Sequence, residues 1–224
     1  MGYSPDEQIT FSTQGINPYF LNAHDIFKLL SKKKDIAQYA TLVKEVYFFG
    51  AGCSSPDKVE IISNGISSFF TNAYVSVDHD LMGSAYATCG DEPGLTCILG
   101  TGSNISYYDG KNLQPSVHGL GYVLGDEGSG TWFGRKLITT YLYGRMPVDL
   151  SLEFAAEFQI DKETVITNVY QKAAPNTYLA SISSFMAAHK EHTFIINLLR
   201  KGFQEFVDNN IKDYDNYRQL IVIL

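Results

Sequence analysis

Residues 78–84, DHDLMGS, gather two carboxylates and an imidazole where a short expected strand, 74–77, comes to its end. In open α/β sheets the ligand crevice lies beyond the carboxyl ends of the strands. A carboxylate placed there can accept a proton from a substrate hydroxyl, which makes Asp80 a candidate general base. Two other interpretations stay open. Asp80 is only the N-cap of the helix expected from Leu81, or it binds a metal with His79, although the five histidines form no convincing metal-binding pair.

Residues 95–104, LTCILGTGSN, place a threonine between two glycines in a turn that joins two expected strands. Glycine lets an anion approach the backbone closely. Consecutive amides, together with the hydroxyls of Thr101 and Ser103, can cradle phosphate oxygens. The turn is not a Walker A loop, because no Gly-Lys-Ser/Thr follows and it does not lead into a helix. The alternative interpretation is an ordinary tight hairpin.

Residues 119–130, GLGYVLGDEGSG, hold five glycines in twelve positions just before an expected helix. Such a stretch is costly in chain entropy for a plain linker. One interpretation is that a carboxylate at the start of this helix does no more than cap it and complement its macrodipole, and this interpretation suits Glu127. It explains the glycines around Asp126 less well, since these imply that a ligand approaches the backbone there.

The elements that position these stretches fall into two halves. The first half alternates strand and helix, as in an α/β fold, with strands expected at 9–14, 43–49 and 74–77 and helices at 22–30 (N-cap Asn22), 56–71 and 81–89. The turn cluster 90–94 is the candidate domain boundary. The second half begins with a meander, marked by the hairpin signal Asp109-Gly110, and continues as helices. Its strands are expected at 95–99, 104–108, 112–117 and 220–224, and its helices at 129–143, 149–158, 161–172, 176–189 and 192–211.

The composition narrows the functional classes. The chain has 224 residues, 45% of them hydrophobic, and a formal net charge of -7, which disfavours a nucleic-acid partner. No run of about 18 uncharged apolar residues occurs, so a membrane span is excluded, and the first ten residues do not form a signal peptide. Three cysteines without a C-x-x-C pair indicate free thiols in a reducing cytoplasm.

The order of the three stretches, DHDLMGSA, LGTGSN and GLGYVLGDEGSG, resembles the eukaryotic-type N-acetylglucosamine kinases and the BadF/BadG/BcrA/BcrD ATPase family. The similarity spans residues 13–143. It implies the actin-like ATPase fold, in which two RNase H-like domains, 1–92 and 93–224, are hinged around a cleft for ATP and sugar. The helix-rich second half then carries a helical insertion.

The resemblance also implies roles for individual residues. Asp80 falls at the catalytic base of the family. The second phosphate loop corresponds to Gly100, Thr101, Gly102 and Ser103, and the sugar contacts correspond to Asn17, Asn104, Gly119, Gly121 and Asp126. Leu120 stands where the family usually has an aromatic residue between the two glycines.

The activity implied is ATP-dependent phosphorylation of an amino sugar, such as N-acetylglucosamine or glucosamine, with Mg²⁺ as second cofactor. No D-G-G-T/S-x-T phosphate loop precedes Ile9, and the chain stops at Leu224, before a glycine-rich adenosine motif. An excerpt of a longer protein or a divergent homologue is therefore expected. The Phe- and Tyr-rich helices of 150–211 offer a surface for a homodimer.

Two other functions remain open. One is a BadF-type activator ATPase, whose subunits share an iron–sulfur cluster through cysteines. The three cysteines, Cys53, Cys89 and Cys97, lack the placement that such a cluster needs. The other is a catalytically degenerate sugar-binding protein, which the missing phosphate loop favours and the retained Asp80 disfavours.

Overall fold

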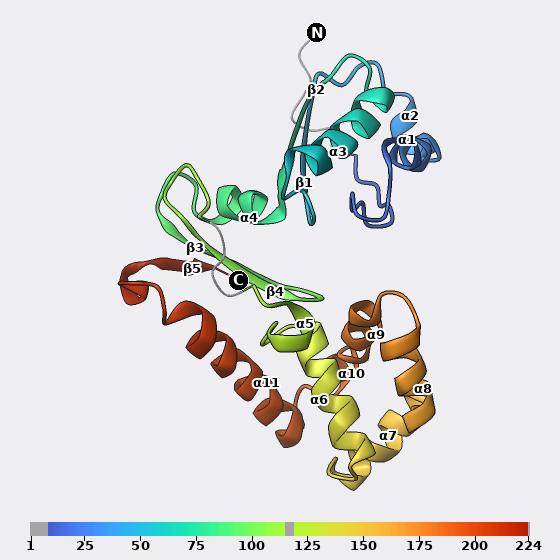
Figure 1. Ribbon diagram of the computed structural model, residues 1–224, viewed down its shortest axis with the longest axis vertical. Coiled ribbons are helices and arrows are strands. Elements are labelled where there is room, and N and C mark those ends of the chain that lie inside the picture. The colour runs from blue at the N-terminus through green and yellow to red at the C-terminus, as the bar shows by residue number, and fades with distance from the viewer. Residues whose placement is uncertain (1–8, 115–118, 224) are drawn as a thin grey trace. The chain divides into compact units, whose positions relative to one another are not determined.

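The computed structural model describes residues 9–114 and 119–223, and it has a mixed α/β fold with two small sheets (Figure 1). The chain divides into two compact units, one up to Gly83 and one from Ser84 on. Each unit is described by itself. In the described ranges, no helix is both long enough and apolar enough to cross a bilayer.

The first unit is built around two parallel strands. β1 (Glu45–Gly50) and β2 (Tyr74–His79) pair in a register that sets Gly50 beside His79. α3 (Pro56–Phe69) lies between this strand pair and α1 (Ala23–Ser31), as Figure 1 shows. The apolar spacing predicted for 56–71 supplies the core here, where Ile62, Ile66 and Phe69 meet residues of α1 and α2 (Lys34–Ala37).

A local signal sets the start of α1. The side chain of Asn22 accepts a hydrogen bond from the Asp25 N–H at 3.0 Å, and Asp25 Oδ2 accepts one from the Asn22 N–H at 3.2 Å. This reciprocal pair is a capping box, and it confirms Asn22 as the N-cap. Close packing fixes the position of α1 on α3, since a Cβ on Gly65 would lie 2.7 Å from Ile26 Cβ.

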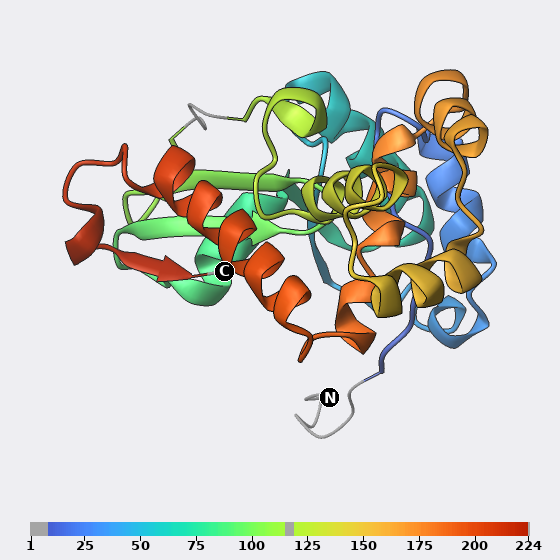
Figure 2. The ribbon, with the colours of Figure 1, turned by 90° about the horizontal axis from the view of Figure 1, so that it is seen from below.

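The second unit contains a three-stranded sheet in the order β4-β3-β5. β3 (Gly94–Leu99) is antiparallel to β4 (Ser103–Tyr108) and parallel to β5 (Ile221–Ile223). One face of the sheet packs on α11 (Thr193–Phe206) and the π-helical turn Val207–Ile211 that continues it. Figure 2 shows α11 crossing this sheet.

Six helices between β4 and α11 form a separate aromatic core around Trp132, Phe154 and Phe185. The Phe154 and Phe185 rings meet edge to face, with centroids 5.1 Å apart. The helices are α5 (Gly121–Leu124), α6 (Gly130–Leu142), α7 (Val148–Phe158), α8 (Lys162–Ile166), α9 (Pro175–Ile182) and α10 (Phe185–Ala188).

Several expected elements differ from the structure. The strand predicted at 9–14 is wrong, because these residues form no strand. Ile9 and Phe11 are 46% and 40% exposed, so the segment does not gain the burial that would stabilise a strand. The strand predicted at 112–117 is reduced to one bridge, Tyr108 with Leu113, and its residues 115–117 lie outside the described ranges.

One expected helix changes its hydrogen-bond pattern and another is interrupted. The helix predicted at 161–172 is continuous, with α8 running directly into a π-helical turn, Thr167–Gln171. The helix predicted at 176–189 is broken between α9 and α10, where the hydroxyls of Ser183 and Ser184 donate to Ala180 O and Ser181 O. Side chains that bond the backbone in this way compete with the helix.

Candidate functional site

The carboxyl ends of β1 and β2 bring two predicted site residues, Asn17 and Asp80, to one edge of the sheet in the first unit. Because the two strands are parallel and Gly50 pairs with His79, the turn after β1 and the start of α4 (Asp80–Thr88) lie at the same edge of the sheet. Asn17 reaches this edge too: a Cβ on Gly52, whose φ is +86°, would lie 2.9 Å from Asn17 Oδ1. Asn17 and Asp80 therefore flank one end of the strand pair.

Asn17 is held by its own turn. Its Oδ1 accepts a hydrogen bond from the Tyr19 N–H at 2.9 Å, an Asx turn that the Asn-Pro pair favours. With Oδ1 engaged, the Nδ2 group is the part of this side chain that can donate to a ligand.

Asp80 is the first residue of α4, and its carboxylate has two close neighbours. His79 Nδ1 lies 2.7 Å from Asp80 Oδ1, and the Leu81 N–H donates to the same oxygen at 2.9 Å. A plain N-cap accepts from a residue two or three positions along, whereas Asp80 accepts from the next residue. The side chains of His79 and Asp80 are 29% and 33% exposed, so a solute can reach them.

The electrostatics of this pair favour an ionised carboxylate. Burial by itself raises the pKa of Asp80, but the hydrogen bond and the charge of His79, with the Leu81 N–H, hold it below its ordinary value. The hydrogen bond to Asp80 raises the pKa of His79, against the effect of burial. Burial also raises the pKa of the Cys53 thiol, and the charges of Asp80 and Asp78 raise it further. Cys53 therefore lies close to the pair as a neutral thiol.

The turn Gly100–Gly102 in the second unit is docked on the start of α6. Gly100 O accepts from the Gly130 N–H at 2.8 Å, and Thr101 O accepts from the Thr131 N–H at 3.0 Å. Thr101 is exposed, and a Cβ on Gly100 would meet no atom of the described chain within 4 Å. The turn thus has an open side, and the positive end of a 13-residue helix lies behind it.

Asp126 faces this turn. A Cβ on Gly102 would come within 2.6 Å of Asp126 Oδ2. Burial raises the pKa of Asp126, and although the Ser103 N–H and the Arg135 charge oppose this, the charge of Glu127 adds to it. Asp126 also adopts a φ of +56°, a left-handed conformation that is uncommon outside glycine. Backbone strain of this kind clusters at functional sites.

The remaining sugar-contact candidates are placed separately. Asn104 lies on β4, where its Oδ1 accepts from the Ile105 N–H at 2.9 Å, so the Nδ2 group is the part of this side chain that can donate to a ligand. Gly121 begins α5 with a φ of +73° and has open space where a Cβ would be, and Gly119 is exposed two residues earlier. Arg135 ties this loop to α6 by donating to Tyr122 O and Val123 O.

Comparison with solved structures decides the family. The chain is 37% identical to the putative N-acetylglucosamine kinase from Porphyromonas gingivalis, with a TM-score of 0.85. The match covers 93% of this chain and 74% of that one. The chain belongs to this N-acetylglucosamine kinase family. The resemblance inferred from the sequence motifs is thereby confirmed.

A second structure in this group shows the fold alone. The putative N-acetylglucosamine kinase from Chromobacterium violaceum is 22% identical, with a TM-score of 0.51, over 72% of this chain and 59% of that one. No family model and no curated protein matches the chain.

Two residues of this family member have contacts that differ from the roles predicted from the sequence. The sequence predicts His79 only as a possible metal ligand, whereas its Nδ1 lies 2.7 Å from Asp80 Oδ1, and its position directly before Asp80 is the signal for this contact. Glu127 was expected to cap α6 or complement its dipole, but Ser129 is the N-cap, with its hydroxyl accepting from the Trp132 N–H. Glu127 instead accepts from Asn209 Nδ2 at 2.9 Å, a contact across 82 positions that no local pattern signals.

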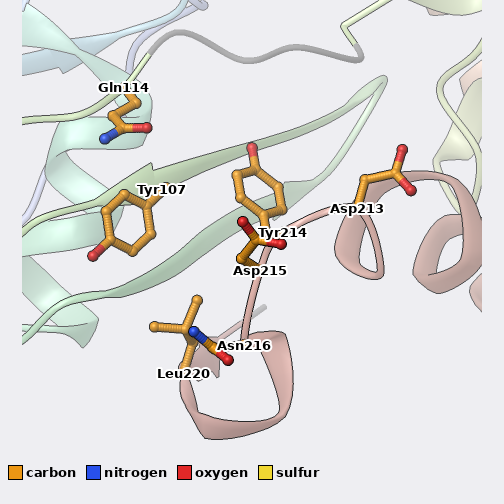
Figure 3. Close-up of a pocket in the computed structure, with 7 residues that line it drawn as sticks. All are labelled: Tyr107, Gln114, Asp213, Tyr214, Asp215, Asn216 and Leu220. Atoms are coloured by element: carbon orange, nitrogen blue, oxygen red, sulfur yellow. The ribbon is translucent and has the colours of Figure 1, made fainter.

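One cavity of this N-acetylglucosamine kinase family member is not part of the predicted site. It measures about 740 Å³ and is lined by Tyr107, Gln114, Asp213, Tyr214, Asp215, Asn216 and Leu220 (Figure 3). Because β4 pairs Ser103 with Leu99 and Tyr107 with Leu95, the cavity lies toward the opposite end of the sheet from the Gly100–Gly102 turn.

Proposed function

We propose that this chain belongs to an ATP-dependent sugar kinase, which transfers the γ-phosphoryl group of ATP to a hydroxyl of an amino sugar. The acceptor is N-acetylglucosamine or glucosamine. The observation that carries the proposal is the Asp80 carboxylate, which is held ionised at the carboxyl end of β2 by His79 and Leu81. The 37% identity to a putative N-acetylglucosamine kinase supports the acceptor class.

The proposal includes the actin-like ATPase fold, with RNase H-like domains at 1–92 and 93–224. The division of the chain into two compact units supports a two-domain arrangement. In such a protein the sugar and the nucleotide bind in a cleft, whose closure expels water and so limits wasteful ATP hydrolysis.

The Gly100–Ser103 turn is suited to the polyphosphate. Its open side at Gly100 and the exposed Thr101 are features that fit an anion, and the positive dipole end of α6 lies behind the turn, although the first N–H groups of that helix are already bonded to Gly100 O, Thr101 O and Ser129 Oγ. Mg²⁺ would neutralise charge on the phosphate oxygens when ATP binds. Among the described residues, no group of three His, Cys, Asp or Glu side chains could hold a metal ion, and Mg²⁺ commonly relies on substrate phosphates and water for most of its ligands.

The other residues have complementary roles in sugar binding. Asn17 and Asn104 each engage Oδ1 locally, so each offers an Nδ2 donor to sugar oxygens. Asp126 offers an acceptor for sugar hydroxyls, and Gly119 and Gly121 let the sugar approach the backbone. Asp80 accepts the proton of the hydroxyl as its oxygen attacks the γ-phosphorus, while catalysis otherwise depends on positioning and charge.

The structure weighs against the activator-ATPase alternative. All three cysteines, Cys53, Cys89 and Cys97, are buried. Burial raises the pKa of Cys97 to about 12. A cluster shared between subunits needs surface thiolates, which buried thiols do not supply.

Measurement of ADP formation and sugar phosphate with Mg-ATP and each amino sugar tests the proposal. Asp80→Asn should lower kcat by at least about 10²-fold, the usual contribution of general-base catalysis, and leave sugar affinity nearly unchanged. Asp149→Asn is the matched control, because Asp149 also pairs with a histidine, His192, but on the helical part of the second unit. Near-normal turnover of Asp80→Asn would show that Asp80 is not the base.

A further inference from the structure

We propose that His79 is a positioning residue for Asp80, which fixes Oδ1 of the carboxylate and leaves Oδ2 to accept the proton of the acceptor hydroxyl. The inference rests on the proposed kinase function and adds to it a second residue and an assignment of the reacting oxygen. The general-base role of Asp80 does not by itself require a hydrogen bond from a histidine, so the role of His79 is a separate inference.

The hydrogen bonds around His79 define its tautomer. Nδ1 lies 2.7 Å from Asp80 Oδ1 and 3.2 Å from the Leu81 nitrogen. One nitrogen cannot both donate to the carboxylate and accept from an N–H. The carboxylate contact is the shorter, and the Leu81 N–H has Oδ1 itself as an acceptor at 2.9 Å. Nδ1 therefore carries a proton and donates it to Oδ1.

Two donors thus converge on one oxygen of Asp80. Charge-assisted hydrogen bonds of this length are stronger than hydrogen bonds between neutral groups. They hold the carboxylate in one orientation and favour its ionised form. Because Oδ1 already accepts from His79 and Leu81, Oδ2 is the carboxylate oxygen that can accept the proton of the sugar hydroxyl. In the transfer step, the sugar oxygen bonds to the γ-phosphorus, the bond from that phosphorus to ADP breaks, and the hydroxyl proton passes to Oδ2.

The backbone that carries the imidazole is fixed by the sheet. His79 is the last residue of β2, opposite Gly50 of β1, and its backbone N–H donates to Asp78 Oδ1 at 2.8 Å. A side chain on a paired strand end is better fixed than one on a loop. The position of Asp80 is therefore determined by the strand through His79 as well as by α4.

The groups around the pair keep His79 protonated and Asp80 ionised over a shared range of pH. The hydrogen bond to Asp80 raises the pKa of His79, and the charges of Asp80 and Asp78 act in the same direction. A further titratable neighbour, Cys53, has a raised pKa and contributes no charge near neutrality. The apparent pKa values measured for the two coupled groups belong to the pair.

The pH dependence of kcat/KM tests the role. His79→Ala should move the acidic limb of the profile upward by about one pH unit or more, because Asp80 stays half-buried but loses its cationic donor. It should also lower kcat by roughly tenfold with sugar KM unchanged, because the carboxylate is less well positioned. His79→Asn should recover most of kcat, since its Nδ2 can donate from nearly the same place as Nδ1.

His192→Ala is the matched control. His192 also pairs with an aspartate, Asp149, and caps α11 by accepting from the Phe194 N–H, so its loss affects stability without touching Asp80. The acidic limb should stay in place in this variant. An acidic limb that is the same in His79→Ala and the wild type would overturn the inference, as would a failure of His79→Asn to recover activity when both variants are folded.

A second measurement needs no kinase activity. The pKa of His79, followed by NMR through the imidazole proton signals, should fall in Asp80→Asn and stay unchanged in Asp149→Asn. An unchanged His79 pKa in Asp80→Asn would show that the pair does not form. If the pair is found but no amino sugar is phosphorylated by the wild type, the proposed kinase function fails while the geometry of the pair stands.

Discussion

The carboxylate of Asp126 occupies the space where any side chain on Gly102 would have to go. A Cβ built on Gly102 would lie 2.6 Å from Asp126 Oδ2 and 3.2 Å from its Cγ. Real Cβ atoms do not approach oxygen this closely, so a side chain at position 102 would displace the Asp126 carboxylate, in a contact between two motifs that are 24 positions apart in the chain. This contact joins the proposed phosphate loop to the proposed sugar-binding carboxylate.

Gly102→Ala should therefore disturb both motifs. Overpacking at a tight contact costs about 1–3 kcal/mol of unfolding free energy, and the shift of Asp126 should weaken sugar binding as well. Urea denaturation and sugar calorimetry measure the two effects. Gly100→Ala is the control for stability, because its Cβ would point into open space, and it should change the unfolding free energy by less than about 0.5 kcal/mol. Equal stability of the two variants would contradict the contact.

Asp126→Asn should make the protein more stable at neutral pH and a weaker sugar binder. Burial raises the pKa of Asp126 in the folded state, so its contribution to stability is full below the unfolded pKa and is lost as pH rises through the folded pKa. Asparagine removes this loss, and it tolerates the φ of +56° that position 126 requires.

The two effects of Asp126→Asn are separable. Stability at pH 7 relative to pH 4 should rise in the variant, as measured by denaturation at both pH values. Sugar affinity should fall by about tenfold or more, the size of a charge-assisted hydrogen bond. A variant with wild-type sugar affinity would remove Asp126 from the binding site, whatever its stability.

Glu127→Ala should destabilise the second unit by about 1 kcal/mol. Glu127 accepts from Asn209 Nδ2 at 2.9 Å and from Asn210 Nδ2 at 3.5 Å, which ties the loop of Asp126 to the turn after α11. Asn209→Ala should cost a similar amount, and the double variant should cost less than the sum. Glu157→Ala, at an exposed position on α7, should be nearly neutral. Additive losses in the double variant would show that the two side chains do not interact.

The sequence predicted the elements that carry their own local signals. Asn22 and Asp25 form the capping box of α1, and the apolar spacing of 56–71 gives α3. Strand propensity at 9–14 failed, because propensity alone cannot supply a partner strand. The break between α9 and α10 was missed, because hydroxyl bonds to the backbone at Ser183 and Ser184 override an otherwise helical pattern.

The candidate site divides in the same way. The position of Asp80 at a strand end could be read from the sequence, because the alternation of strand and helix places it there. The pairing of Glu127 with Asn209 could not, since only the folded chain brings the two together. The approach of Gly102 to Asp126 also depends on the folded chain, and the glycines around the two motifs were its only signal in the sequence. The roles assigned to these residues remain predictions.

Gly83→Ala sets helix propensity against packing at the start of α4. Alanine should favour a helix by about 1 kcal/mol over glycine, but a Cβ on Gly83 would lie 2.7 Å from Phe49 Cγ and 2.8 Å from Phe49 Cβ. These atoms are close to the β1 backbone and cannot swing away, so α4 must shift. A shift at a cost of about 1–3 kcal/mol outweighs the gain in propensity.

The shift of α4 in Gly83→Ala also displaces Asp80, three residues earlier, so kcat should fall while the sugar KM changes little. Gly15→Ala, in open space, should leave both stability and kcat unchanged, and a more stable and fully active Gly83→Ala protein would show that α4 tolerates the extra methyl group.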